Sequence, residues 1–231
     1  MGASALSQIS AIDNAVPAHV IGALRTEIIE STVTDSGTHW YSLAAPARLL
    51  FEQVIQHLRS FVPGGQELVG AEWWLRATTT DTGFPFHFDR DEGVRRSIVS
   101  PDVSSILYLS DAGGPTVILD AKPARVSAPN AGIAVYPRRG RFGLFPGTLL
   151  HGVLPGRPSR WPRVTMLVNW WRSVPRLERA PELDGTPASP RWRVDADRVR
   201  TTSARLASLD PSRLLAKAAW RDLIAKQATY R

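Results

Sequence analysis

Three residues of this 231-residue chain carry side chains that can bind a single metal ion. His87 and Asp89 lie two positions apart in the aromatic run Phe-Pro-Phe-His-Phe-Asp-Arg at 84–90. On a β-strand, residues i and i+2 point to the same side, so both can hold an ion from one face. By itself this pair is equally compatible with a solvated strand end. His151, which lies between the apolar residues Leu150 and Val153, supplies a second imidazole and makes a metal site the sharper hypothesis.

Two imidazoles and one carboxylate that leave other coordination positions open are typical of non-haem Fe(II) oxygenases. Zinc can occupy the same three ligands, so the triad alone does not identify the metal. Arg163 favours the first interpretation, because it opens an apolar strand and a buried guanidinium requires an anionic partner. Its planar fork binds a carboxylate through two parallel hydrogen bonds. We therefore expect a dicarboxylate that chelates the metal at one end and meets Arg163 at the other.

Composition narrows the class of protein. The chain contains no cysteine, which excludes disulfides and thiolate ligands and leaves His, Asp and Glu to hold any metal. With 43% apolar residues it can bury a sizeable core. It shows no membrane-length apolar run and no signal-peptide layout, which predicts a soluble, cytoplasmic protein with no membrane partner. The net charge of +7 is compatible with nucleic acid, with the arginine usage of a GC-rich genome or with an acidic small substrate.

The N-terminal part predicts helical support for a sheet. Residues 1–44 indicate a short helix or strands. From Pro46 to Val62, apolar residues recur at the i, i+3, i+4, i+7 spacing of a helix, which Pro63-Gly64-Gly65 ends. His57 is off this apolar stripe and is predicted to face solvent.

The central part predicts a mainly β fold. Many short strands with turn residues between them favour a sandwich or barrel over βαβ units. The predicted strands are 69–80, the run around His87, 104–110, 116–119, 133–136, 141–145 and 163–171. Strands 133–136 and 141–145 are interpreted as a hairpin around Pro137–Gly140, with Arg138, Arg139 and Arg141 in a solvated turn. Residues 173–200 indicate a loop or arm, and Asp210-Pro211 starts a C-terminal helix.

The order of these motifs resembles the 2-oxoglutarate/Fe(II)-dependent dioxygenases, in the prolyl-hydroxylase-like branch. The family pattern is H-x-D, a distal His, and an Arg or Lys roughly a dozen residues later. Ile-Leu-Tyr-Leu-Ser at 106–110, followed by Gly-Gly-Pro-Thr at 113–116, matches a strand and turn that the family places between its histidines. The resemblance covers about residues 69–172. It implies mainly β architecture with flanking helices around a double-stranded β-helix (jelly-roll or cupin-like) core. The expected division of this single domain is 1–66 for helical support, 67–172 for the catalytic core and 173–231 for the arm and last helix.

The resemblance also implies roles for individual residues. His87, Asp89 and His151 would ligate Fe(II), and Arg163 would bind the far carboxylate of 2-oxoglutarate. Tyr108 matches a tyrosine that helps to hold that carboxylate in some members, and Thr165 matches a weaker pairing in another branch. The implied reaction consumes O2, converts 2-oxoglutarate to succinate and CO2, and usually hydroxylates the substrate.

Residues at two positions argue against particular branches of this family. The family's halogenases have a small residue where this chain has Asp89, which argues against halogenation. Its nucleic-acid demethylases carry a second arginine where this chain has Asn169, which argues against a nucleic-acid partner.

The substrate remains open between a small molecule, an amino acid or peptide-like natural product, and a prolyl peptide. A metal-binding β-barrel without turnover is the alternative from another class, and a zinc hydrolase is more distant. The tryptophan pairs Trp73-Trp74 and Trp170-Trp171, with Arg76, are either pocket, core or rim residues. The loop 91–101, with Arg95 and Arg96, is a hypothetical lid that attracts an acidic or carboxylate-bearing substrate.

Overall fold

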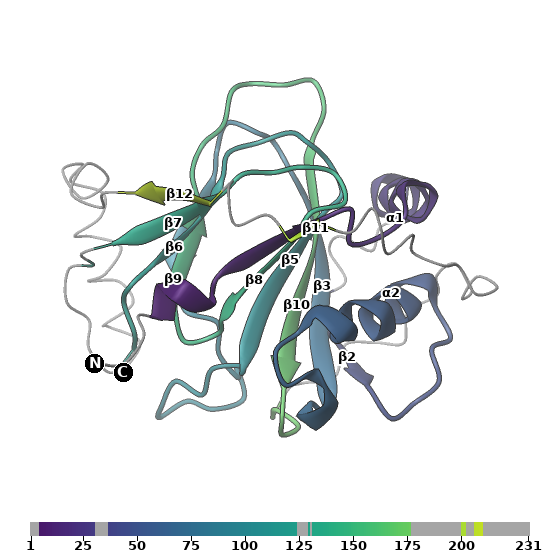
Figure 1. Ribbon diagram of the computed structural model, residues 1–231, viewed down its shortest axis with the longest axis vertical. Coiled ribbons are helices and arrows are strands. Elements are labelled where there is room, and N and C mark those ends of the chain that lie inside the picture. The colour runs from purple at the N-terminus through teal and green to yellow at the C-terminus, as the bar shows by residue number, and fades with distance from the viewer. Residues whose placement is uncertain are drawn as a thin grey trace.

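A computed structural model of the chain describes residues 5–30, 37–123, 129, 131–176, 200–201 and 206–209, the last two segments as backbone only. Two antiparallel sheets face each other, and two helices lie to one side (Figure 1). The helices are α1 (Ala18–Glu30) and α2 (Leu50–Leu58). Among the described helices, none is long and apolar enough to cross a membrane.

Eight consecutive strands form the core of the two sheets. They are β3 (Gly70–Thr78), β4 (Phe84–His87), β5 (Val103–Tyr108), β6 (Thr116–Leu119), β7 (Gly132–Val135), β8 (Phe142–Pro146), β9 (Leu150–Val153) and β10 (Arg163–Trp171). One sheet contains the order β8-β5-β10-β3 and the other the order β7-β6-β9-β4. These are the two four-stranded sheets of a jelly roll, in which the chain passes from one sheet to the other after every strand except between β6 and β7. The predicted double-stranded β-helix core is therefore confirmed by the strand order.

Four further strands extend the sheets at their edges. β1 (Ser10–Asp13) pairs with β8, and β2 (His39–Ser42) pairs with β3. β11 (Arg200–Thr201) adds to β1, and β12 (Leu206–Leu209) adds to β7. The N-terminal part thus contributes two strands as well as helices, and β12 was not predicted. The predicted helix at Asp210 lies outside the described residues.

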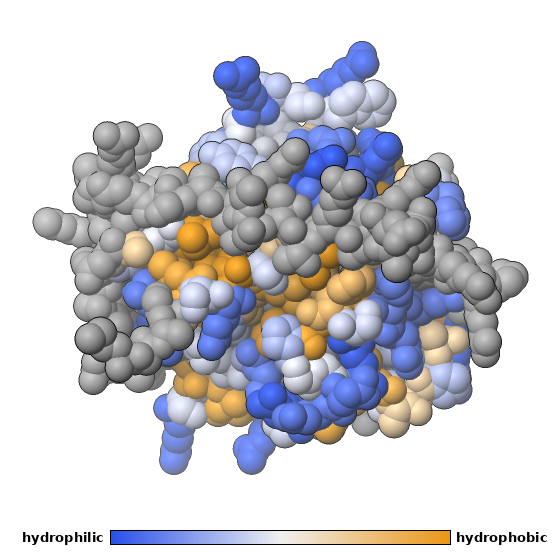
Figure 2. Space-filling model, viewed as in Figure 1, coloured by the Kyte–Doolittle hydropathy of each residue, from blue (hydrophilic) through white to orange (hydrophobic). Residues whose placement is uncertain are grey.

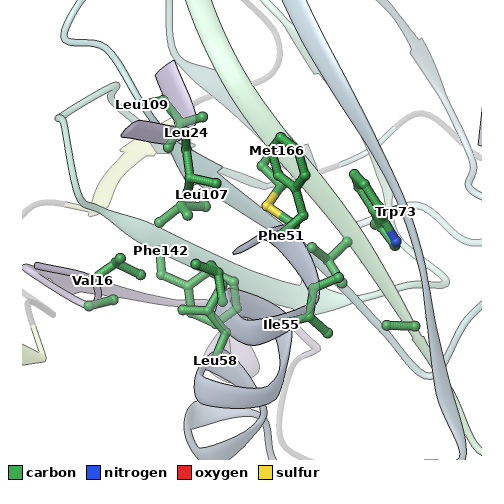
Figure 3. Close-up of a cluster of buried hydrophobic side chains, with 14 of the residues drawn as sticks. Val16, Leu24, Phe51, Ile55, Leu58, Trp73, Leu107, Leu109, Phe142 and Met166 are labelled. Carbon is green, nitrogen blue, oxygen red and sulfur yellow. The ribbon is translucent and has the colours of Figure 1, made fainter. Parts of the chain in front are cut away.

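The helices cover the outer face of the seven-stranded sheet. α2 is amphipathic, and its buried residues Phe51, Ile55 and Leu58 lie against Met166 of β10 and Phe142 of β8 (Figure 3). Burial of large aliphatic and aromatic side chains contributes about 1.5–3 kcal/mol each. This outer core leaves the opposite face of the same strands free to line a cavity between the sheets.

Helix α2 begins at Leu50, four residues after the predicted start at Pro46. The side chain of Glu52 accepts hydrogen bonds from the backbone N–H groups of Arg48, at 2.6 Å, and Leu49, at 3.0 Å. These contacts satisfy donors that a helix end leaves unpaired, so the helix starts where its cap is available. His57 is half-buried rather than solvent-facing, because its Nε2 lies 2.8 Å from the carbonyl oxygen of Ala15.

The predicted hairpin of residues 133–136 and 141–145 is wrong. β7 pairs with β6 and β12, whereas β8 pairs with β1 and β5 in the other sheet. The turn between them therefore carries the chain across the sandwich, which turn residues alone do not reveal. Arg141 is buried rather than solvated: its Nε donates to Asp13 Oδ1 at 2.6 Å, and Arg138 adds a bond to the same carboxylate.

The face of the molecule seen in Figure 2 is apolar at its centre and hydrophilic at its rims. In the view of Figure 2, apolar residues gather at the centre of the face, and hydrophilic residues gather along its upper and lower rims. Exposed large apolar side chains are otherwise scattered, and they include Ile98 and Val99 in the 91–101 loop.

Candidate metal centre

The cavity between the sheets is lined by side chains that alternate strictly with the outer core. On β3, Trp73 and Leu75 belong to the outer core, so Trp74 and Arg76 face the cavity. On β10, Arg163 and Leu167 face the same cavity. β10 lies antiparallel to β3, which sets Thr165 opposite Arg76 and Asn169 opposite Glu72. The cavity wall therefore carries the guanidinium groups of Arg76 and Arg163 beside the apolar side chains of Trp74, Ile106 and Leu167.

His87, Asp89 and His151 converge at one end of this cavity. β4 and β9 are neighbours and place His87 directly opposite His151, and Asp89 follows the end of β4. His87 Nε2 lies 3.5 Å from Asp89 Oδ1, and His151 Nε2 lies 3.6 Å from Asp89 Oδ2. One ligand atom from each residue lies within 4.8 Å of the others. Ligands about 2.1 Å from one ion are themselves about 3.0–3.5 Å apart, so the spacing suits a metal.

Both imidazoles are held in one tautomer by their own strands. His87 Nδ1 lies 3.0 Å from the carbonyl oxygen of Pro85, and His151 Nδ1 lies 3.0 Å from that of Leu149. A carbonyl only accepts, so each Nδ1 carries the proton and each Nε2 presents a lone pair. Two lone pairs and a carboxylate thus face one another, an arrangement of acceptors only. A cation at their centre satisfies all three.

The electrostatics of the triad favour an ionised Asp89 carboxylate and a neutral His151 imidazole. Burial disfavours the charged form of Asp89, but the two histidines and the Ser104 hydroxyl outweigh it and lower its pKa to about 2. Ser104 Oγ donates to Asp89 Oδ2 at 2.7 Å. Burial also lowers the pKa of His151, and nearby His87 lowers it further, although Asp89 opposes both. These are the protonation states that metal ligation needs.

Arg163 lies in the same cavity and has one unpaired donor. Its Nη2 donates to Thr116 Oγ1 at 3.1 Å, and Nη1 lies 3.4 Å from Thr165 Oγ1. Its Nε is buried and has no hydrogen-bond partner among the described residues. No carboxylate of the described part of the chain forms an ion pair with it, although a desolvated guanidinium needs one. The unmet donor and charge fit a carboxylate ligand.

Tyr108 and Thr116 form the wall beside this guanidinium. The Tyr108 hydroxyl donates to Thr116 Oγ1 at 2.8 Å, and the Arg163 guanidinium carbon lies 5.4 Å from the Tyr108 ring centroid. Gly113, at φ +97°, brings the preceding turn against Arg163, where an added Cβ would lie 2.6 Å from the arginine Cδ. The left-handed conformation and the close approach both require glycine here.

The structure gives a position to each residue of the predicted site. The structure brings His87, Asp89, His151, Arg163 and Tyr108 into one cavity region, as expected, although it does not test their roles. Of the tryptophans, Trp74 lines the cavity, whereas Trp73 and Trp170 are outer-core residues and Trp171 is buried away from the cavity lining. Arg95 and Arg96 are exposed and do not line it.

Three functional candidates escaped the sequence reasoning. Ser104 bonds Asp89, Thr116 bonds Arg163, and Glu72 is a buried carboxyl group facing Asn169. A usable signal existed for Ser104, because strand alternation places it on the same face as Tyr108. The other two depend on how strands distant in sequence are paired.

Comparison with protein-family models and with curated proteins finds no match for this chain. Solved structures do resemble it. A prolyl-4-hydroxylase from Pseudomonas putida is 20% identical, with 71% of this chain and 84% of that chain covered and a TM-score of 0.49. HygX from Streptomyces hygroscopicus, with nickel and 2-oxoglutarate bound, is 16% identical over 80% of this chain and 91% of that one, at a TM-score of 0.48. A viral collagen prolyl hydroxylase from Paramecium Bursaria Chlorella virus-1 is 14% identical over 74% and 92%, at 0.46. At these levels the function proposed below rests on the side chains of this chain.

Proposed function

We propose that this protein is a 2-oxoglutarate/Fe(II)-dependent dioxygenase that hydroxylates a C–H bond. The observation that carries the proposal is that two groups of side chains in one cavity each lack the binding partner that their chemistry requires. His87, Asp89 and His151 present only acceptors to a common point, and Arg163 presents a buried, unpaired donor. A divalent metal satisfies the first need and the distal carboxylate of a metal-chelating dicarboxylate satisfies the second.

In this proposal each residue of the cavity has a role that its position supports. His87, Asp89 and His151 would hold Fe(II), and the backbone carbonyls behind the imidazoles keep their lone pairs aimed at it. Arg163 would bind the far carboxylate of 2-oxoglutarate, with Tyr108 and Thr116 as its wall. When bound, the iron and 2-oxoglutarate supply the oxidation of the substrate by O2, with succinate and CO2 as co-products. The apolar middle of the cavity, at Ile106 and Leu167, keeps water away from the reacting centre.

The substrate enters from the His87 side. His87 is 30% exposed, whereas Asp89 and His151 are almost completely buried. The β3–β4 connection, with Thr79, Thr80 and Gly83, lines this side of the cavity. We propose a small molecule, an amino acid or a peptide-like natural product as the substrate, rather than nucleic acid. A prolyl peptide is the second candidate, and turnover of proline-containing peptides against free small molecules separates the two.

The test combines binding with turnover. In a thermal-shift assay, Mn(II) should raise Tm, and 2-oxoglutarate should raise it further only when the metal is present. His151→Ala should remove both shifts, and Arg163→Gln should weaken 2-oxoglutarate binding by about 100-fold while the metal shift remains. The matched controls are His19→Ala and Arg160→Gln, which replace exposed residues of the same types.

Turnover distinguishes an enzyme from a binding module. With Fe(II), O2 and a substrate library, the wild-type protein should form succinate from 2-oxoglutarate, and the His151→Ala variant should not. Metal and 2-oxoglutarate binding without succinate formation would instead favour a non-catalytic sensor. A protein that binds Mn(II) but shows no response to 2-oxoglutarate would contradict the proposal.

A further inference from the structure

Arg76 is a second cation in the cavity, and no carboxylate of the described residues forms an ion pair with it. It lies on the cavity face of β3, opposite Thr165 of β10. Its guanidinium carbon is 4.0 Å from the centroid of the Phe84 ring, a cation–π contact. Within the part of the chain that the structure describes, the guanidinium makes no hydrogen bond and no ion pair, so the cation–π contact with Phe84 is the specific interaction found for it there.

Phe84 links this cation to the candidate metal centre. The Phe84 and His87 rings meet edge to face, with centroids 5.1 Å apart and an interplanar angle of 80°. One aromatic ring therefore separates the Arg76 guanidinium from a metal-binding imidazole. Because the ring covers one face of the guanidinium, its N–H edge remains available to a ligand in the cavity.

The charges of the proposed loaded site leave Arg76 unneutralised. A divalent ion, the Asp89 carboxylate and the Arg163 guanidinium together carry two positive charges, which a dicarboxylate cancels. Arg76 is additional to this balance. Burial lowers the pKa of Arg76, and Arg163 lowers it further, while Asp89 raises it. The charged form of Arg76 is therefore destabilised by its surroundings in the empty cavity, and a bound anion would stabilise it.

Other acids of the described cavity do not fill this need. Glu72 lies four residues away on β3, roughly 13 Å along an extended strand, and is not among the residues that line the cavity. Asp89 already accepts from Ser104 and faces both histidines. No acid of the described residues supplies the missing anion, which favours a bound molecule as its source.

We propose, on the basis of the proposed oxygenase function, that Arg76 binds an oxyanion of the substrate, so that the enzyme selects acids whose anionic group lies close to the oxidised carbon. A guanidinium fork accepts both carboxylate and phosphate, so the shared feature is a planar or tetrahedral oxyanion. The short separation through Phe84 favours a compact acid in which one end contacts Arg76 while the other reaches the His87 side of the metal. Arg76 is thus the specificity-determining residue.

The experiment measures anion preference on the intact protein loaded with Mn(II) and 2-oxoglutarate. The probes are N-acetyl amino acids, their matched primary amides, and phosphate monoesters of similar size. Paramagnetic relaxation of the probe protons by Mn(II) reports both binding and proximity to the metal. The wild-type protein should bind at least one acid about 10-fold or more tightly than its amide, and the carboxylate and phosphate arms identify the preferred oxyanion.

Variants assign the preference to one side chain. Arg76→Gln should abolish the difference between acid and amide, Arg76→Lys should restore part of it, and 2-oxoglutarate affinity should stay within about twofold in both. Arg160→Gln is the matched control, because Arg160 also stacks on an aromatic ring, that of Trp161 at 5.1 Å, but lies on the exposed surface. Melting temperatures establish that each variant is folded.

Three results would overturn the proposal. These are an equal affinity of the wild-type protein for acids and amides, a preference that survives in Arg76→Gln, and a loss of 2-oxoglutarate binding in Arg76→Gln. The last result would make Arg76 a co-substrate ligand. The same probe titrations are repeated with Mn(II) and without 2-oxoglutarate, which keeps the two proposals separate. If the protein does not bind 2-oxoglutarate, the oxygenase function is contradicted. The acid and amide affinities of wild type and Arg76→Gln can still be compared under this condition.

Discussion

Replacing Glu72 by glutamine should make the metal-free protein more stable at alkaline pH. Glu72 is 5% exposed, and its one hydrogen-bonding neighbour of known distance is Asn169 Nδ2, at 3.5 Å. Burial raises its pKa to about 7, and the nearby Asp89 and Asp91 carboxylates raise it as well, while contacts with Asn169 and Trp171 oppose them. The native protein therefore keeps a proton on this carboxyl group at pH values where the unfolded chain has lost it.

The size and sign of the effect follow from proton linkage. Between pH 4.5, the ordinary value, and about 7, the native state binds more protons than the unfolded state, so stability falls as pH rises. Each pKa unit corresponds to about 1.4 kcal/mol, which gives a loss of about 3 kcal/mol that is complete above pH 7. Glutamine does not titrate, so the variant avoids this loss. For a chain of this length, about 3 kcal/mol corresponds to a Tm difference of roughly 6–12 °C.

The assay is urea unfolding of the wild type and of Glu72→Gln between pH 5 and 8.5 in the presence of a chelator. The two proteins should have similar stability at pH 5 and diverge as pH rises, with the glutamine variant more stable at pH 8. Glu92→Gln is the control, because Glu92 is 68% exposed and its ion pair with Arg90 is on the surface. Parallel stability curves for wild type and Glu72→Gln would refute the reasoning.

Three other substitutions test the supports of the cavity. Ser104→Ala removes a hydrogen bond to Asp89 and should weaken Mn(II) binding about 10–100-fold in an EPR titration, and unchanged affinity would show that this contact is dispensable. Gly113→Ala should lower 2-oxoglutarate affinity at least 10-fold, as measured by isothermal titration, because the new Cβ would contact Arg163. Gly37→Ala is the control, since Gly37 has a similar positive φ but no atom within 4 Å of the new Cβ. Equal effects of the two substitutions would exclude the proposed contact. Arg141→Met removes the buried partner of Asp13 and should lower the free energy of unfolding in urea by about 3 kcal/mol. The loss should not be larger, because the more exposed Arg138 still pairs with the Asp13 carboxylate. A loss under about 1 kcal/mol would contradict a structural ion pair.

Much of the fold is predictable from the sequence because jelly-roll strands are short, alternating and separated by turn residues. The strand at 116–119 matches β6, and the long strand at 163–171 matches β10. The apolar periodicity of α2 is equally clear, although its start depends on a Glu52 contact that periodicity does not contain. The sheet in which each strand lies is a non-local property. The error at residues 133–145 shows this, because a four-residue turn closes a hairpin or crosses a sandwich with the same residue types.

The candidate site also contains features that the sequence predicts and features that depend on the pairing of distant strands. His87 and Asp89 are close because of strand spacing, which any reader of the sequence can see. His151 joins them only because β9 lies beside β4. The neighbours of the triad depend on three-strand registers: Ser104 on β5 and Glu72 on β3 both lie opposite Asn169 of β10. Arg76 was visible as a pocket, core or rim residue, but only the assembled cavity shows that no described carboxylate pairs with it.

The carbonyl contacts of His87 and His151 have a consequence for how this protein can change. Each imidazole is oriented by a peptide group two residues earlier on its own strand, not by a side chain from elsewhere. Side chains on the facing sheet, such as Trp74 and Arg76, are then free to vary without rotating the histidines. Directed evolution for new substrates should therefore find its tolerant positions on β3, while the metal-facing strands stay fixed.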